Sequence, residues 1–253
     1  MVNKNPIDTS NHSTAEALPN QPGPTVGHLP LHIQISEMLV REIKAGMLAN
    51  EEKLPPERQM AERLQISVGT LRKALSDLES KGMLVRKHGS GNYVHNNPEV
   101  DNVYALFRLE LTEGGGLPTA ELLSVDTLKK PDSLPSFGKS DHAHRFRRLR
   151  RLNGINAALE EIWLDCSYVE SININEVPES LYLFYKETLG FWITRAEDRV
   201  SVATLPDWTP DGFLAADHSH CGYVERLSRD NNGTLAEYSR TWFDAHTVRF
   251  VAR

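Results

Sequence analysis

The chain has 253 residues, of which 40% are hydrophobic and 25% are charged, and its formal net charge is -6. This length suits one or two domains with packed cores. The distribution of apolar residues excludes a helical membrane protein, since no stretch approaches the roughly 18 uninterrupted apolar residues that a spanning helix needs. Having only two cysteines, Cys166 and Cys221, excludes a disulfide framework and a four-cysteine zinc site.

Charge is distributed unevenly along the chain. Residues 31–95 contain ten Lys and Arg against eight Asp and Glu, whereas residues 96–253 contain 17 against 24. The early basic excess is modest, so it favours phosphate binding only if the basic side chains share one face. The N-terminus lacks a basic stretch followed by an apolar one, so we expect no secretory signal and a cytoplasmic protein.

The first part of the chain predicts a leader followed by a helix. Residues 1–29 are rich in Pro, Gly, Asn, Ser and Thr without an apolar period, which predicts a disordered leader. From Pro30 to Gly46 a helix is predicted, because apolar residues recur at steps of three and four: Leu31, Ile35, Met38, Leu39 and Ile43.

Two further helices and a hairpin are predicted up to residue 95. A short helix begins at Glu57 after two prolines, and Ser67 is suited to cap a third helix that ends at Lys81-Gly82. The inward face of the third helix is made of Leu71, Ala74, Leu75 and Leu78. Met83–Val85 and Asn92–Val94 then predict two strands around a basic tip that contains glycine.

The third helix has a polar side that points away from its leucines. Hydroxyls and free backbone N–H groups at a helix start suit phosphate oxygens, and an arginine there suits a guanine edge. The residues on this side are Ser67, Val68, Gly69, Thr70, Arg72 and Lys73, and Arg86 belongs to the basic hairpin tip. For any one of them an exposed polar face explains the pattern equally well, whereas the ordered set of helices and hairpin favours DNA binding.

Residues 30–95 resemble the winged helix-turn-helix domain of the GntR family of bacterial regulators. The resemblance is carried by Leu54-Pro55-Pro56-Glu57-Arg58, by Ser67 through Leu75, and by Gly82-Met83-Leu84 with Arg86 through Val94. It implies that the third helix enters the major groove of operator DNA, and it adds Arg58, His88 and Gly89 to the expected contacts. Many relatives have an arginine where this chain has Val68, so their operator sequence is not implied.

Residues 96–102 are predicted to be a linker, and residues 103–253 an α+β domain. The predicted strands are Tyr104–Leu111, Glu121–Val125, Phe146–Leu152, Ala157–Asp165, Phe191–Thr204, Tyr223–Ser228 and Leu235–Phe243. The predicted helices are Ser180–Glu187 and Pro210–Ala216.

Polar residues interrupt these otherwise apolar strands in a pattern that indicates a binding site. Arg148 and Arg150 alternate with Leu149, so both guanidinium groups point to one face. With Glu160, Glu237 and the helix start at Ser180, they are suited to an anionic, hydroxyl-rich molecule. Each of these residues also has an explanation that involves no ligand. The arginines would lie on a solvated strand edge, Ser180 would only cap a helix, and Glu160 would only pair with a nearby arginine.

Residues 103–252 resemble the HutC-type ligand domain, also called UTRA. The carrying segments are Arg148-Leu149-Arg150, Asn153-Gly154, Leu159-Glu160, Ser180-Leu181-Tyr182 and Glu237-Tyr238-Ser239. The resemblance implies a mixed antiparallel-sheet domain of the chorismate-lyase-like type, and it adds Tyr182 and Phe243 to the expected effector residues. At Phe243 an aromatic hydroxyl of many relatives is absent, which removes one hydrogen bond.

The two resemblances together imply a transcriptional regulator, not an enzyme, with no cofactor. We expect a homodimeric repressor on a pseudo-palindromic operator, controlled by a small anion such as a sugar phosphate, an organic acid or a phosphonate. The alternative is a regulator whose second domain only mediates dimerisation or partner binding.

No metal site is predicted. His218-Ser219-His220-Cys221 has suitable residue types, but successive residues of a strand point to opposite faces and a fourth ligand is lacking. Asp141-His142-Ala143-His144 is predicted to be an exposed loop.

Overall fold

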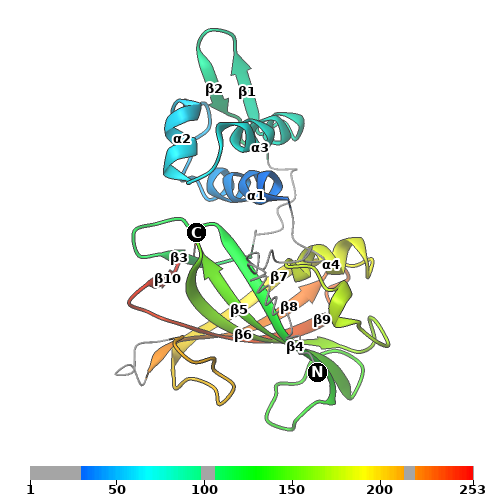
Figure 1. Cartoon of the computed structure of the whole chain (residues 1–253). Helices are drawn as coiled ribbons and strands as arrows, with labels where there is room; N and C mark the ends of the chain where they lie inside the picture. The colour runs from blue at the N-terminus through cyan, green and yellow to red at the C-terminus, as the bar shows by residue number, and fades with distance from the viewer. Residues whose placement is uncertain (1–29, 98–105, 214–219, 253) are drawn as a thin grey trace, which may run out of the picture.

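The computed structural model describes residues 30–97, 106–213 and 220–252. They form an N-terminal domain of helices with a hairpin and a C-terminal domain built on an antiparallel sheet (Figure 1). The predicted leader, 1–29, and residues 98–102 of the predicted linker lie outside these ranges. The α+β class is confirmed.

The N-terminal domain follows the predicted order of elements. It contains α1 (Leu31–Lys44), α2 (Glu57–Arg63), α3 (Val68–Ser80), β1 (Leu84–Lys87) and β2 (Gly91–Val94). The Ser67 hydroxyl caps α3 by accepting a hydrogen bond from the Thr70 N–H at 3.0 Å. The apolar faces of the three helices pack into one core, in which Ile35, Leu71 and Leu75 are fully buried.

The hairpin extends away from this core (Figure 1). β1 and β2 pair antiparallel, and Gly89 at the tip has a φ of 70°, a left-handed conformation that glycine adopts without strain. Lys87, His88 and Gly89 are exposed there.

The C-terminal domain is organised around a six-stranded sheet in the order β4-β5-β6-β9-β8-β7. Its strands are β4 (Pro118–Lys129), β5 (His142–Leu152), β6 (Ile155–Asp165), β7 (Ile193–Ala203), β8 (Cys221–Asp230) and β9 (Leu235–Phe243). All neighbouring strands are antiparallel. A separate pair is formed by β3 (Leu109–Leu111) and β10 (Val248–Phe250), and a short 3-10 helix spans Ile174–Glu176.

Helix α4 (Leu181–Glu187) packs on one face of this sheet. Phe184 and Tyr185 of α4 contact the buried Phe146, Ile162 and Leu164 of the strands. On the opposite face, loop residues such as Phe137 and Trp208 cover the remaining apolar side chains. The face that carries α4 also holds the pocket described below.

Several sequence predictions for the C-terminal domain are wrong. Residues 210–213 of the predicted helix Pro210–Ala216 form turns, and residues 214–216 lie outside the described ranges. Of the predicted strand Tyr104–Leu111, residues 104–105 lie outside the described ranges and only Leu109–Leu111 of the rest form a strand, β3, while β10 was not predicted. Both β3 and β10 have only three residues, too few to show an alternating pattern.

The segment Asp141–His144 is not an exposed loop, because β5 begins at His142. His144 is fully buried and hydrogen-bonds with the Thr127 hydroxyl and the Val169 carbonyl oxygen, each at 2.9 Å. Within the described ranges, no three His, Cys, Asp or Glu side chains gather as metal ligands. No helix in those ranges is long and apolar enough to cross a membrane.

Candidate functional site

The residues expected to contact DNA lie on α2, around the start of α3 and in the hairpin. Eight of the ten are exposed, namely Arg58, Ser67, Gly69, Arg72, Lys73, Arg86, His88 and Gly89, while Val68 and Thr70 are half-buried. The Val68 side chain packs against the hydrophobic core of the N-terminal domain. The Thr70 hydroxyl is 2.8 Å from that of Ser67, so the two share a hydrogen bond at the start of the helix.

Two of these arginines are held by carboxylates. Nε of Arg72 donates to Oε2 of Glu57 at 2.7 Å, which joins α3 to the first turn of α2. Arg86 on β1 similarly lies 2.9 Å from Glu79 near the end of α3. Both pairs orient a cation on the exposed surface of the N-terminal domain.

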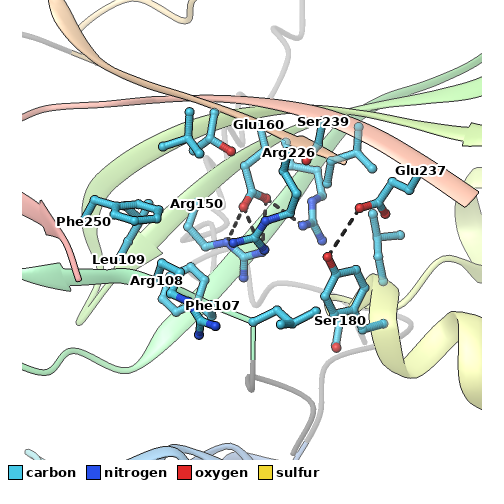
Figure 2. Close-up of a pocket in the computed structure, with 17 residues that line it drawn as sticks. Phe107, Arg108, Leu109, Arg150, Glu160, Ser180, Arg226, Glu237, Ser239 and Phe250 are labelled. Carbon is cyan, nitrogen blue, oxygen red and sulfur yellow. Dashed lines mark hydrogen bonds and ion pairs between the residues drawn. The ribbon is translucent and has the colours of Figure 1, made fainter. Parts of the chain in front are cut away.

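A pocket lies on the α4 face of the C-terminal sheet (Figure 2). It encloses about 770 Å³ of empty space, a figure that includes its opening to solvent. Strands β5, β6, β8 and β9 form its floor, and its walls come from Ser180–Tyr182, from Leu106–Leu109 and from Phe250 on β10.

Strand register explains why distant residues meet on the pocket floor. Arg148, Glu160, Thr241 and Val224 lie directly opposite one another across β5, β6, β9 and β8. Because alternate residues of a strand share a face, Ser239 and Glu237 of β9 follow Thr241 along the floor.

Glu160 is the centre of a buried ionic cluster. Nη2 of Arg148 donates to its Oε2 at 2.6 Å, and Nη2 of Arg150 donates to both of its oxygens at 3.1 and 3.2 Å. Burial alone would raise the pKa of Glu160, but the two arginines outweigh it and lower the pKa to about 2. The buried Nε of Arg148 has no hydrogen-bond partner among the described residues.

A second buried carboxyl, Glu237, is surrounded by hydroxyl groups instead. It accepts hydrogen bonds from Tyr185 at 2.7 Å, from Ser228 at 3.0 Å and from Tyr182 at 3.4 Å. Burial raises the pKa of Glu237, although these hydrogen bonds act in the opposite direction. The pocket therefore has a side lined by arginines and a side that combines a carboxyl with hydroxyls.

Both domains of the chain are similar to known protein families. The family model for bacterial regulatory proteins of the gntR family matches residues 31–94, and the UTRA domain model matches residues 113–249. HTH-type transcriptional regulator SmoD from Agrobacterium fabrum is 53% identical over 229 residues, which cover 90% of this chain and 98% of SmoD. The chain belongs to the GntR family.

Two more distant relatives extend the similarity over most of the chain. HTH-type transcriptional repressor NagR from Bacillus subtilis is 26% identical, over 88% of this chain and 94% of NagR. The solved structure of YydK from the same species covers 89% of this chain and 99% of its own, with a TM-score of 0.50 and 21% identity, which shows a shared fold. This GntR-family protein is therefore a DNA-binding transcriptional regulator with a UTRA domain, and not an enzyme.

Six of the seven effector residues expected in the UTRA domain line the pocket. They are Arg148, Arg150, Glu160, Ser180, Tyr182 and Glu237. Ser180 also caps α4 by accepting a hydrogen bond from the Leu183 N–H at 3.3 Å, and Glu160 also pairs with Arg148. The alternative roles expected for these two residues, a helix cap and an arginine partner, are therefore present in addition to their place in the pocket. Whether these residues bind an effector stays a prediction.

Phe243 does not line the pocket. It occupies the next row of the floor, between Ala158 of β6 and Gly222 of β8. Its ring fills the space beside Gly222, where a Cβ atom would lie 2.2 Å from it. Phe243 is 6% exposed and packs under β3 and β10, so its role is in the core.

Other pocket residues escaped sequence reasoning. Thr241 follows Glu237 and Ser239 by the two-residue period of a strand, a signal that would have found it, and Ser239 belongs to a segment that carries the UTRA resemblance. Arg226 reaches the pocket only through the register of β8 against β9, and both its Nε and Nη2 bind Asp198, at 2.6 and 2.9 Å. Phe107 and Arg108 precede β3 in an irregular segment, which gives no periodic signal.

Proposed function

We propose that this regulator is a homodimeric repressor of the HutC-type branch, and that a small anionic metabolite in the UTRA pocket controls its affinity for operator DNA in the bacterial cytoplasm. The relative NagR is named a transcriptional repressor, which supports repression over activation. In this proposal the ten N-terminal residues described above contact a pseudo-palindromic operator, and the six pocket residues hold the effector.

The charge of the pocket carries the proposal for an anion. Four arginines and two glutamates line it, a formal excess of two positive charges. Asp198, which pairs with Arg226, reduces the local excess to one. A phosphate, carboxylate or phosphonate group would compensate this charge and would offer acceptors to donors such as the buried Nε of Arg148. Hydroxyl groups of the same molecule would reach Glu237.

The exposed edge of the sheet supports a dimer. β7 is the last strand in the sheet order, and its Val200 and Val202 are 54% and 69% exposed. A long edge strand with exposed apolar side chains is unusual in a monomer, because it presents unpaired backbone groups for association. A second copy of the chain placed along β7 would cover both valines and would provide the two-fold symmetry that a palindromic operator requires.

DNA binding in the presence of anions tests the proposal. A selection from random duplexes with the full chain would identify the operator, and fluorescence anisotropy would then measure affinity with sugar phosphates, organic acids and phosphonates, each beside its uncharged parent. We expect at least one anion to weaken operator binding tenfold or more, and its neutral parent to have no effect. Arg108→Gln should weaken the response to that anion by about tenfold.

Arg151→Gln is the matched control, because the Arg151 side chain is 32% exposed on β5, away from β7, and does not line the pocket. If no anion alters operator affinity, or if neutral parents act equally, the proposal of an anionic effector is wrong. The alternative, a UTRA domain that serves only in dimerisation, would then be favoured.

A further inference from the structure

The ring of Phe107 contacts guanidinium groups from two different domains. Arg41 of α1 has its guanidinium carbon 5.4 Å from the ring centroid, and Arg150 of β5 has its own at 5.0 Å. Both distances are within the range of a cation–π interaction. Arg41 and Arg150 are each 7% exposed, so water screens neither contact strongly.

Phe107 is part of a wider contact between the domains. Leu117, just before β4, packs against the hydrophobic core of the N-terminal domain. Gly115 lies against α1 as well, since a Cβ atom on it would be 3.8 Å from Oε1 of Glu42. Among these contact residues of the C-terminal domain, Phe107 is the one that also lines the pocket (Figure 2).

Arg150 is suited to respond to a ligand. Its hydrogen bonds to Glu160 measure 3.1 to 3.3 Å, whereas Arg148 binds the same carboxylate at 2.6 Å. A ligand anion would attract the Arg150 guanidinium through charge-assisted hydrogen bonds. Because that guanidinium also lies over the ring of Phe107, its displacement would alter the ring's contact with Arg41.

We propose that Phe107 couples the position of Arg150 in the pocket to helix α1 of the N-terminal domain. Phe107 is thus a positioning residue that links ligand binding to the placement of the DNA-binding helices. The identity of the signal as an anion rests on the proposed function, whereas the coupling between Arg150 and α1 is a property of the chain alone.

Amide hydrogen exchange in α1 of the full chain, without any ligand, tests the coupling. Arg150→Lys keeps a cation beside Glu160 but replaces the planar group that lies over the ring. We expect it to accelerate exchange in α1 by roughly three- to tenfold. Arg148→Lys is the matched control, since Arg148 binds the same carboxylate and has no ring contact with Phe107, and it should change α1 exchange less than about twofold.

The decisive comparison repeats Arg150→Lys in a Phe107→Leu background. There it should add nothing to the exchange of α1, while Leu117→Ala should still accelerate exchange and show that the assay remains sensitive. An equal effect of Arg150→Lys in both backgrounds overturns the proposal. Equal effects of the two lysine variants also overturn it, because a general loosening of the sheet would produce them.

The outcome is separable from that of the proposed function. The exchange experiment contains no ligand, so a negative result here leaves an anionic effector standing. Conversely, if no anion alters operator binding, a positive exchange result still assigns the coupling between the pocket and α1.

Discussion

At the scale of single residues, Arg72 is oriented before any DNA is present. Its Nε is bound by Glu57 at 2.7 Å, while its side chain is 66% exposed. An ion pair this exposed contributes about 0–1 kcal/mol to stability, so its main consequence is orientation. With Nε engaged, the two Nη atoms remain as donors for a guanine edge or a phosphate.

We therefore expect Glu57→Gln to weaken operator binding about threefold to tenfold without a measurable loss of stability, because Arg72 loses its orientation. Arg72→Ala should cost about 1–3 kcal/mol in binding and reduce the salt dependence. Anisotropy titrations at several salt concentrations measure both effects, with Glu62→Gln, an exposed carboxylate of α2, as the control. Tighter binding by Glu57→Gln would contradict the prediction, since it would mean that the carboxylate only repels DNA.

The buried ion pairs of Glu160 lead to a prediction for the stability of the folded protein. Its pKa is lowered from 4.5 to about 2, so its ionised form stabilises the folded state. This contribution is fully present above pH 4.5 and is lost as the pH falls through about 2. We expect Glu160→Gln to lower the free energy of unfolding by about 3 kcal/mol at pH 7.

Urea unfolding across pH checks this expectation. The difference between the wild type and Glu160→Gln should narrow as the pH falls from 4.5 towards 2. Glu121→Gln removes a carboxylate that is 53% exposed and paired with Arg151, and it should change stability little at any pH. A difference for Glu160→Gln that does not depend on pH would refute the assignment of the ionised cluster.

At the scale of elements, the sequence predicted what periodicity and capping encode. The leucine period of α3 and its cap at Ser67 are local signals, and both are present in the structure. Alternation along β5 placed Arg148 and Arg150 on one face for the same reason. Arg226 and Phe107 were missed because their place in the pocket depends on strand register and on an irregular segment, which are properties of the folded chain.

The edge strand β7 carries a prediction about association. A lysine at position 202 would put a charge on the exposed apolar edge, so Val202→Lys should raise the dimer dissociation constant tenfold or more. Sedimentation equilibrium of the full chain measures this constant. Ile155→Lys is the control, because Ile155 is 49% exposed at the start of β6, away from β7. Unchanged association of Val202→Lys would exclude β7 as the dimer surface.

At the scale of the whole molecule, the two binding reactions must be reciprocal. If an anion weakens operator binding by some factor, saturating operator must weaken anion binding by the same factor. Calorimetric titration of the anion, with and without the selected duplex, compares the two factors. Arg108→Gln should reduce anion affinity in both titrations and leave the ratio unchanged. Unequal factors in the wild type would show that the anion also acts outside the pocket.

The wall of the pocket is made from both ends of the C-terminal domain. Leu106–Leu109 precede the UTRA match at residue 113, and β10, which pairs with β3, ends at Phe250. A shortened protein that starts at the match boundary would lack this wall and the partner strand of β10. Screening libraries against such a fragment would examine a groove that lacks one wall of the pocket, and ligands that depend on that wall would be overlooked.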